Sequence, residues 1–320
     1  MSKKAVVAQL REHEKYERLV AATKGLEALA TAVAHPCDES SLRGALEAAE
    51  AGMIIPILVG PRDRIVNLAK SHDIKLQGVD IVDVPHSQAA AEKAVELVRT
   101  GHARLLMKGS LHSDELLGAV TSRENGLRTA RRISHVFVMD VPTHPHTLFI
   151  TDAAVNIAPD LIAKRDIVQN AIDLYAALGL GIPKVAILSA VETINPSIPS
   201  TIEAAALCKM ADRGQITGCE IDGPLAFDNA ISPEAARVKG INSAVAGWAQ
   251  ILVVPDLEAG NMLAKNLTFL SRADAAGLVL GARVPLILTS RADNVRTRMA
   301  SCAVAMLLAH SQGTKKPIRA

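Results

Sequence analysis

The sequence of 320 residues predicts an α/β protein with a parallel sheet that is covered by helices on both faces. Short apolar runs of four to six residues alternate with longer helical patterns almost throughout the chain. Continuous apolar strands joined by helices are typical of a buried parallel sheet. Apolar residues make up 49% of the chain and aromatic residues only 2%, so the core is predicted to consist of Ala, Leu, Val and Ile.

Ten segments have the length and composition of buried strands. They are residues 54–59, 79–84, 104–107, 135–140, 147–151, 184–188, 218–221, 251–254, 277–280 and 286–288. The first fifty residues are predicted to add little beyond helices.

Several helices are indicated by polar residues that cap helix starts. Asp38 opens a predicted helix, Ser87 precedes a helix over residues 89–98, and Ser113 opens the next one. Pro159 indicates the start of a helix that runs to about Leu178 and ends in glycine.

The pattern changes between residues 122 and 145, where a polar stretch precedes a strand. The following segment, Pro142-Thr-His-Pro-His146, is typical of a hairpin or a crossover. We therefore expect a domain boundary near Arg132.

Charge and composition limit the classes of partner. The net charge is +2, with 35 Lys and Arg against 33 Asp and Glu, and few aromatic side chains are available to stack on bases. These features argue against a nucleic-acid partner. Four widely spaced cysteines, no apolar signal core and no membrane-spanning run predict a cytoplasmic protein without a membrane partner.

Three polar loops follow predicted strands in the last third of the chain, over residues 218–228, 251–261 and 286–293. They contain Asp222, then Gly260 with Asn261, and then Ser290 with Arg291. Ligands bind where strands of an open α/β sheet end. We therefore expect one polar cleft and an enzyme rather than a binding scaffold.

Each of these loops has a functional and a structural interpretation. Ser290 and Arg291 suit an anion, because hydroxyl, guanidinium and backbone N–H donors converge there, but a capped turn with a salt bridge gives the same pattern. Asp222 is either a base or orienting group, or a turn residue. Gly260 and Asn261 are either a ligand contact or an ordinary helix start.

Three further groups contain polar side chains with two interpretations. Lys108, Gly109 and Ser110 follow a strand and are rich in donors, but they lack the spacing of a nucleotide-binding Walker loop. Asp152 and Asn156 need hydrogen-bond partners if they are buried. Arg131 and Arg132 belong to the densest basic cluster and either hold phosphate oxygens or are solvated.

His144 and His146 have no third ligand nearby, so no metal site is predicted.

Taken together, the motifs resemble the phosphate acetyltransferase/phosphate butyryltransferase family from about Ile54 to the C-terminus. The matching strings are Met107-Lys-Gly, Gly126-Leu-Arg-Thr with Arg131-Arg-Ile-Ser-His135, Thr151-Asp-Ala-Ala-Val-Asn-Ile-Ala-Pro-Asp160, Asp222-Gly-Pro-Leu-Ala, Pro255-Asp-Leu-Glu-Ala-Gly-Asn261 and Leu288-Thr-Ser-Arg-Ala-Asp293.

The resemblance implies two α/β/α domains with a cleft between them, in the fold of isocitrate and isopropylmalate dehydrogenases, and a homodimer. The first domain would comprise residues 1–132 plus 298–320, and the second would comprise residues 133–297. The implied reaction is reversible transfer of a short acyl group, acetyl or butyryl, between coenzyme A and phosphate. Acyl-CoA and phosphate would be the substrates, and no cofactor would be bound permanently.

The resemblance also implies roles for residues. Ser290 would contact the CoA sulfur, and Arg291 would hold phosphate and polarise the thioester carbonyl. Asn261 and the loop from Lys108 to Ser110 would complete the anion site, and Asp222 would orient these donors.

One position departs from the acetyl-specific pattern. Thr297 stands where many acetyltransferases of the family have an acidic residue that acts as a base toward the thiol. Two other functions remain open at this point: an NAD-linked, metal-dependent decarboxylating dehydrogenase of the same fold, and a non-catalytic sensor of CoA or acyl phosphate.

Overall fold

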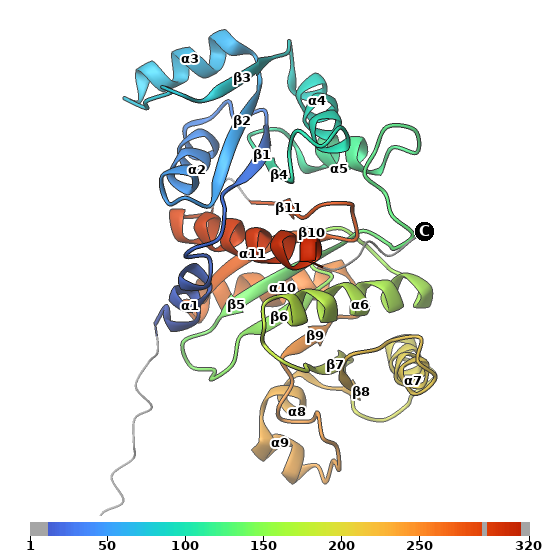
Figure 1. Cartoon of the computed structure of the whole chain (residues 1–320). Helices are drawn as coiled ribbons and strands as arrows, with labels where there is room; N and C mark the ends of the chain where they lie inside the picture. The colour runs from blue at the N-terminus through green and yellow to red at the C-terminus, as the bar shows by residue number, and fades with distance from the viewer. Residues whose placement is uncertain (1–11, 290–292, 315–320) are drawn as a thin grey trace, which may run out of the picture.

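The computed structural model describes residues 12–289 and 293–314. Within these residues, eleven strands form one continuous sheet in the order β3-β2-β1-β4-β11-β10-β5-β6-β9-β7-β8 (Figure 1). The fold is therefore a mixed α/β fold with a large sheet. In the described part of the chain, no helix is both long and apolar enough to span a bilayer.

The strands are β1 Leu29–Ala34, β2 Ile54–Gly60, β3 Asp80–Asp83, β4 Leu105–Lys108, β5 Ser134–Asp140, β6 Leu148–Thr151, β7 Lys184–Leu188, β8 Glu220–Leu225, β9 Ile251–Val253, β10 Asp274–Leu280 and β11 Leu286–Ile287. The helices are α1 Glu14–Ala22, α2 Glu39–Glu50, α3 Arg62–Ser71, α4 Ser87–Arg99, α5 Ser113–Thr121, α6 Leu161–Ala177, α7 Pro199–Asp212, α8 Phe227–Ile231, α9 Pro233–Val238, α10 Leu257–Leu270 and α11 Val295–Thr314.

The sheet is mixed, so the prediction of an all-parallel sheet is wrong at its centre. β10 pairs antiparallel with both β11 and β5, and β5 pairs antiparallel with β6. The strands on either side of these pairs are parallel to their neighbours. The hairpin between β5 and β6 is one of the two topologies that the segment Pro142–His146 predicted.

Strand β1 corrects the expectation that the first fifty residues add little beyond helices. It lies between β2 and β4, in the middle of one half of the sheet. Its sequence, Leu-Ala-Thr-Ala-Val-Ala, favours a helix by composition. Its small side chains instead let α4 pack closely, because Ala32 and Ala34 are buried in the same cluster as Ala90 and Ala94 of that helix.

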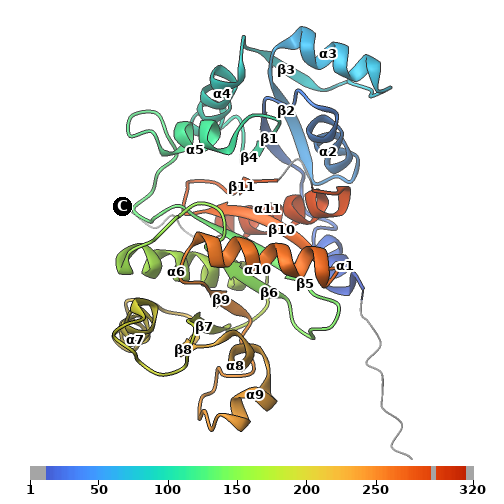
Figure 2. The same cartoon turned by 180° about the vertical axis from the view of Figure 1, so that it is seen from behind.

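Helices cover both faces of the sheet. Residues of α2, α3, α6, α7 and α11 share one large core cluster with the strands, on the side seen in Figure 1. Figure 2 shows the opposite side, where α4 and α5 cover one half of the sheet and α8, α9 and α10 cover the other. The two halves on this side therefore have separate cores, whereas the side with α11 has one.

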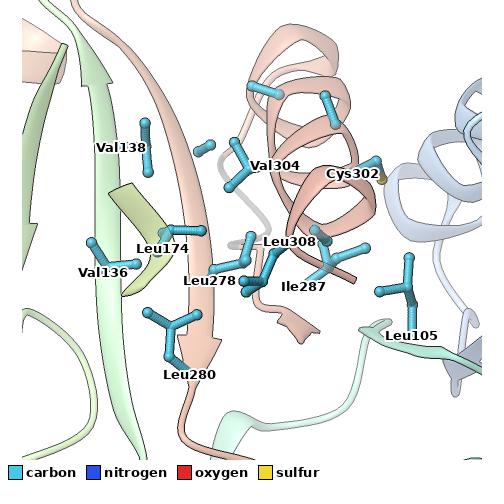
Figure 3. Close-up of a cluster of buried hydrophobic side chains, with 14 of the residues drawn as sticks. Leu105, Val136, Val138, Leu174, Leu278, Leu280, Ile287, Cys302, Val304 and Leu308 are labelled. Carbon is cyan, nitrogen blue, oxygen red and sulfur yellow. The ribbon is translucent and has the colours of Figure 1, made fainter. Parts of the chain in front are cut away.

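Helix α11 lies across the middle strands and is apolar on nearly all sides. Figure 3 shows Cys302, Val304 and Leu308 of this helix packed among side chains from β4, β5, β10, β11 and α6. A helix that is apolar all round is stable only when it is enclosed. α11 contacts α2 and α6 as well as β10, so it joins the two halves of the molecule.

A buried histidine lies at the centre of the sheet, on the face opposite α11. His135 of β5 is 1% exposed, and its ring packs edge-on against Phe137 with 4.5 Å between ring centroids. A Cβ atom at Gly277 would lie 3.2 Å from Nε2 of His135, so the glycine makes room for the ring. Nδ1 has no hydrogen-bond partner among the described residues. Burial lowers the pKa of His135 to about 4, against a smaller opposing effect of Asp152.

This lowered pKa predicts a loss of stability in acid. Between pH 6.5 and 4 the unfolded chain binds a proton at His135 that the folded protein excludes. The contribution of this group to the free energy of unfolding is therefore present above pH 6.5 and falls by about 2 kcal/mol between pH 7 and pH 5. Urea unfolding at both pH values should show a pH dependence that is about 2 kcal/mol smaller in His135→Phe than in the wild type, because burial also lowers the pKa of His144 to about 4 and that contribution remains. The variant His102→Phe, at an exposed position, should keep the full difference; an unchanged pH dependence in His135→Phe would contradict the assignment.

Candidate active site

The predicted site residues gather at two opposite edges of the sheet. β1, β4 and β11 end at one edge, whereas β6, β8 and β9 run the other way and end at the opposite edge. The strands that precede the three polar loops, β8, β9 and β11, therefore do not all end at the same edge. The single polar cleft stays a prediction. The antiparallel pairings of β10 and β5 reverse the strand direction between β11 and β9.

The first group, here the Lys108 cluster, surrounds the end of β4 and comprises His35, Cys37, Lys108, Gly109, Ser110 and Thr289. Lys108 is buried, and its ammonium donates to the carbonyl oxygens of Gly109 and Thr289, each at 3.4 Å. Because β11 lies next to β4, this lysine ties the end of β4 to the residue directly before Ser290.

Gly109 and Ser110 lie against the chain that follows β1. The N–H of Gly109 donates to the carbonyl oxygen of Ala34 at 2.8 Å, and a Cβ atom on Gly109 would lie only 2.4 Å from that oxygen. The Ser110 hydroxyl donates to the carbonyl of His35 at 2.8 Å and accepts from the N–H of Cys37 at 3.3 Å. Any residue other than glycine would break this close contact.

The pKa values of a nearby thiol and a nearby imidazole are both shifted in the direction that favours the uncharged form. Burial raises the pKa of the Cys37 thiol to about 11. Burial, assisted by Arg64, lowers the pKa of His35.

The two residues to which the resemblance gives catalytic roles, Ser290 and Arg291, lie outside the described residues. Both flanks of this segment are anchored. Thr289 on one side accepts from Lys108, and on the other side Asn294 accepts from the N–H of Thr297 at 2.8 Å and so caps α11.

The second group, here the Asp152 cluster, lies at the ends of β6 and β9 and comprises Arg132, His135, Asp152, Asn156, Gly260 and Asn261. Asp152 is buried at its centre. Its carboxylate accepts from the backbone N–H groups of His135 at 3.1 Å, Ala154 at 2.9 Å and Val155 at 3.0 Å. It also accepts from the side-chain amide of Asn156 at 2.5 Å. A carboxylate with this many donors holds the loop after β6 in place.

Asn156, which Asp152 holds in place, in turn binds the side chain of Arg132. Its side-chain oxygen accepts from Nε of Arg132 at 2.8 Å. The backbone of Arg132 is held as well, because its N–H donates to Asp166 at 2.9 Å and its carbonyl accepts from Asn170 at 2.9 Å. The terminal nitrogens of this exposed arginine have no partner among the described residues.

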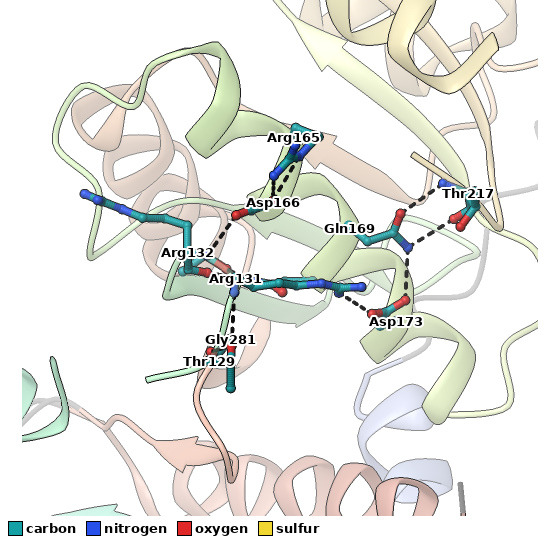
Figure 4. A network of polar contacts seen from close by, with 11 residues as sticks. Thr129, Arg131, Arg132, Arg165, Asp166, Gln169, Asp173, Thr217 and Gly281 are labelled. Carbon is teal, nitrogen blue, oxygen red and sulfur yellow. Dashed lines mark hydrogen bonds and ion pairs between the residues drawn. The ribbon is translucent and has the colours of Figure 1, made fainter. Parts of the chain in front are cut away.

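Arg131 and Arg132 differ in their surroundings. Figure 4 shows the side chain of Arg131 reaching to Asp173 of α6, with which it forms an ion pair, while Arg132 points in the other direction. The charge of Arg131 is therefore compensated, whereas the guanidinium of Arg132 faces solvent and is available to an anion.

Gly260 and Asn261, in the first turns of α10, pack against the loop after β6. A Cβ atom on Gly260 would lie 2.8 Å from the carbonyl oxygen of Asp152. The side-chain amide of Asn261 donates to the carbonyl of Ala153 at 3.3 Å. The structure thus brings Asp152, Asn156, Arg132, Gly260 and Asn261 together, apart from the Lys108 cluster.

Asp222 belongs to neither group. It lies within β8, the last strand of the sheet, and not in a turn. Six strand spacings separate β8 from β11, about 29 Å measured along the sheet. The role that the resemblance gives Asp222, orienting the donors of the anion site, stays a prediction, since Ser290 and Arg291 lie outside the described residues. Its carboxylate accepts from the N–H of Gly223 at 2.8 Å.

Two residues that hold the Asp152 cluster were missed from the sequence. Asp166 and Asn170 of α6 bind the backbone of Arg132. The available signal was two polar residues four positions apart on a helix that buries most of its side chains. Among the described residues, no group of three His, Cys, Asp or Glu side chains is placed to hold a metal ion.

Sequence comparison gives the family. The family model "Phosphate acetyl/butaryl transferase" matches residues 85–306. A phosphate acetyltransferase of Rhizobium meliloti is 72% identical over 92% of this chain and 93% of its own length. A phosphate butyryltransferase of Clostridium acetobutylicum is 43% identical over 92% of this chain and 98% of its own length.

Solved structures of phosphotransacylases have the same fold as this chain. A branched-chain phosphotransacylase from Enterococcus faecalis superposes with a TM-score of 0.77 and 31% identity, over 88% of this chain and 99% of that one. A 4-hydroxythreonine-4-phosphate dehydrogenase from Klebsiella pneumoniae, with a TM-score of 0.53 and 11% identity over 88% of this chain and 100% of that one, shares the fold alone. Because the family model spans more than half of the sequence and both curated relatives cover most of it, the chain belongs to the phosphate acetyl/butyryl transferase family.

Proposed function

We propose that the protein transfers a short acyl group reversibly between coenzyme A and inorganic phosphate and so forms an acyl phosphate. The observation that carries this proposal is 72% identity, over 92% of the chain, with a protein named phosphate acetyltransferase. Acetyl is therefore the first acyl group to test, and butyryl is the second because of the relative with 43% identity. Relatives at these identities are named for acyl transfer, which favours this function over a dehydrogenase or a sensor.

The Lys108 cluster supports the role proposed for Ser290 and Arg291. Phosphate must be held beside the thioester carbonyl, and the leaving thiolate must be stabilised. Lys108 binds the carbonyl oxygen of Thr289, the residue directly before Ser290. In this scheme Ser290 contacts the CoA sulfur, and Arg291 binds phosphate and polarises the carbonyl.

The Asp152 cluster supports an anion contact by Arg132. The saturated carboxylate of Asp152 makes it a structural residue, and Asn156 orients the guanidinium of Arg132. Gly260 and Asn261 hold the same loop from the side of α10. The substrate group that Arg132 contacts is a phosphate of CoA or inorganic phosphate.

Thr297 leaves the proton of the CoA thiol without a carboxylate acceptor at this position. Thr297 is buried in the first turn of α11 and has no group that titrates near neutral pH. We infer that the proton passes to water or to phosphate. The acyl-CoA thioester is a substrate in this scheme, and no permanently bound cofactor takes part.

The division into domains and the cytoplasmic location remain proposals. Residues 1–132 contribute the four strands β1–β4, and residues 133–297 contribute the seven strands β5–β11. The core under α8–α10 contains only residues of the second range, which supports this division, whereas the core under α4–α5 also contains Val279 of β10 and Leu286 of β11.

The test of function is release of CoA from acetyl-, propionyl-, butyryl- and isobutyryl-CoA, followed with a thiol reagent. Release that requires phosphate, with formation of acyl phosphate, is expected. Arg291→Ala should lower kcat by about 100-fold or more, the scale of losing a donor to the transition state. Near-normal turnover in a folded Arg291→Ala protein would contradict its role, and absence of turnover with every thioester in the wild type would contradict the function.

Arg131 and Arg132 offer a matched pair. Arg132→Gln should raise KM for CoA or for phosphate by about tenfold, because an oriented and uncompensated guanidinium is lost. Arg131→Gln should change neither KM by more than about twofold, since Asp173 already neutralises that charge. Initial rates with each substrate varied in turn distinguish the two. Equal effects in both variants would show that the difference in charge compensation has no functional meaning.

We also propose that two copies associate through α10. Figure 2 shows this helix on the outer surface of the molecule. Met262, Phe269 and Leu270 are 65%, 74% and 77% exposed on it. Phe269 is one of only four phenylalanines in the chain. Exposed apolar side chains that gather on one helix are typical of an interface.

Light scattering after size-exclusion chromatography tests this proposal. The wild type should have the mass of a dimer, and Phe269→Asp should shift it toward the monomer, because the new charge would be buried unpaired. Ile182→Asp, at a loop position with 74% exposure, is the control and should leave the mass unchanged. A dimer that persists in Phe269→Asp would place the interface elsewhere.

A further inference from the structure

Phe137 is the exception to the burial of strand β5. The other six residues of this strand are buried, whereas Phe137 is half-buried. β5 lies between β10 and β6, near the middle of the sheet. In a sheet with helices on both faces, an aromatic side chain on a middle strand is expected to be enclosed. Part of the Phe137 ring is instead accessible.

Two separate cores meet beside this ring. On the face of β10 opposite α11, Ala275 belongs to the core under α8–α10 and Val279 belongs to the core under α4–α5. Because side chains alternate along a strand, Gly277 is the position between them on that face. Gly277 is also the residue of β10 that pairs with Phe137. β10 therefore places no side chain against the ring at this position.

Leu288 and His135 complete the surroundings of Gly277. A Cβ atom on Gly277 would lie 2.8 Å from the carbonyl oxygen of Leu288 and 3.7 Å from Cε1 of Phe137. Nε2 of His135 would be 3.2 Å from the same Cβ atom. Burial lowers the pKa of His135 to about 4, so its ring carries no charge at neutral pH. These four uncharged residues are called the Phe137 surface here: Phe137, His135, Gly277 and Leu288.

The Phe137 surface lies next to the segment that carries acyl transfer in the proposed function. Leu288 directly precedes Thr289, whose carbonyl oxygen accepts from Lys108. Ser290 is two residues from Leu288 in the sequence, and two residues of chain span at most about 7 Å. In the proposed function Ser290 contacts the CoA sulfur, and the acyl group is bonded to that sulfur. The acyl chain is then within reach of the Phe137 surface.

We propose that Phe137 contacts the acyl chain of the thioester and so sets the chain length that the enzyme prefers. This inference rests on the proposed function and adds a specificity-determining residue to it. The acyl chain is the apolar group next to the thioester, and its transfer from water to an apolar surface is favourable. The ring occupies the space that a third and a fourth carbon would need. Phe137 therefore favours acetyl over butyryl.

The ratio of kcat/KM for butyryl-CoA to kcat/KM for acetyl-CoA tests this role. Phe137→Ala and Phe137→Leu both make room for a longer chain. The ratio should rise at least about tenfold in Phe137→Ala and at least about threefold in Phe137→Leu, because the added methylenes gain an apolar site. A loss of folded protein lowers both kcat/KM values equally and cancels in the ratio. Phe137→Leu decides the question if Phe137→Ala does not fold.

Phe149→Leu is the matched control. Phe149 of β6 is fully buried in the core on the α11 side of the sheet, with its ring centroid 5.2 Å from that of Tyr175. The control makes the same substitution as Phe137→Leu, on the neighbouring strand and on the opposite face. It should lower the free energy of unfolding and leave the ratio as it is in the wild type.

Failure of this inference is distinguishable from failure of the proposed function. If the wild type releases no CoA from any thioester in the presence of phosphate, both are overturned. If the wild type turns over but Phe137→Leu keeps the wild-type ratio, the role of Phe137 is overturned and the proposed function stands. An equal rise of the ratio in Phe149→Leu would likewise overturn the role of Phe137, since it would show a general effect of core substitutions.

Discussion

The reversal of strand direction at β10 and β5 is the constraint on which the rest of the structure depends. A single hydrogen-bonded sheet runs through all eleven strands, yet its two halves end at opposite edges. In an open sheet the carboxyl end of a strand is where loops are free to carry polar side chains. This molecule therefore has two such edges, and the Lys108 cluster and the Asp152 cluster occupy one each. A substrate with charged groups far apart, as CoA has, suits a protein with two polar edges.

Each cluster uses charge differently. In the Lys108 cluster one buried ammonium is directed at backbone carbonyls, so its main effect is to fix where β11 ends. In the Asp152 cluster a buried carboxylate accepts hydrogen bonds from backbone N–H groups and from the side chain of Asn156. Asn156 in turn orients the guanidinium of Arg132, which remains in solvent. The rigid parts of both clusters are thus backbone loops. The groups left to meet a substrate are few, and among them Arg132 is oriented but not neutralised.

Local signals in the sequence predicted most elements but not their directions. Strands such as β7 and caps such as that of Asp38 were expected where they lie, because apolar runs and helix starts are properties of neighbouring residues. The direction of β10 depends on its pairing with β5, which lies more than a hundred residues earlier, and no pattern of neighbouring residues predicts that direction. β1 was missed because its alanines favour a helix until α4 packs on them. The separation of Asp222 from β11 likewise follows from strand order and not from its motif.

The position of α11 has a consequence for how the chain reaches its native state. Arg298 of this helix binds Ser40, and Arg104 binds the carbonyl of Ala309, so the last helix completes contacts with segments made more than two hundred residues earlier. Contacts of such sequence separation form late, since loop closure costs entropy before it is repaid. On a ribosome, the apolar sides of α2 and α6 stay uncovered until α11 has been made. Until then these two helices expose apolar side chains to water and are open to aggregation.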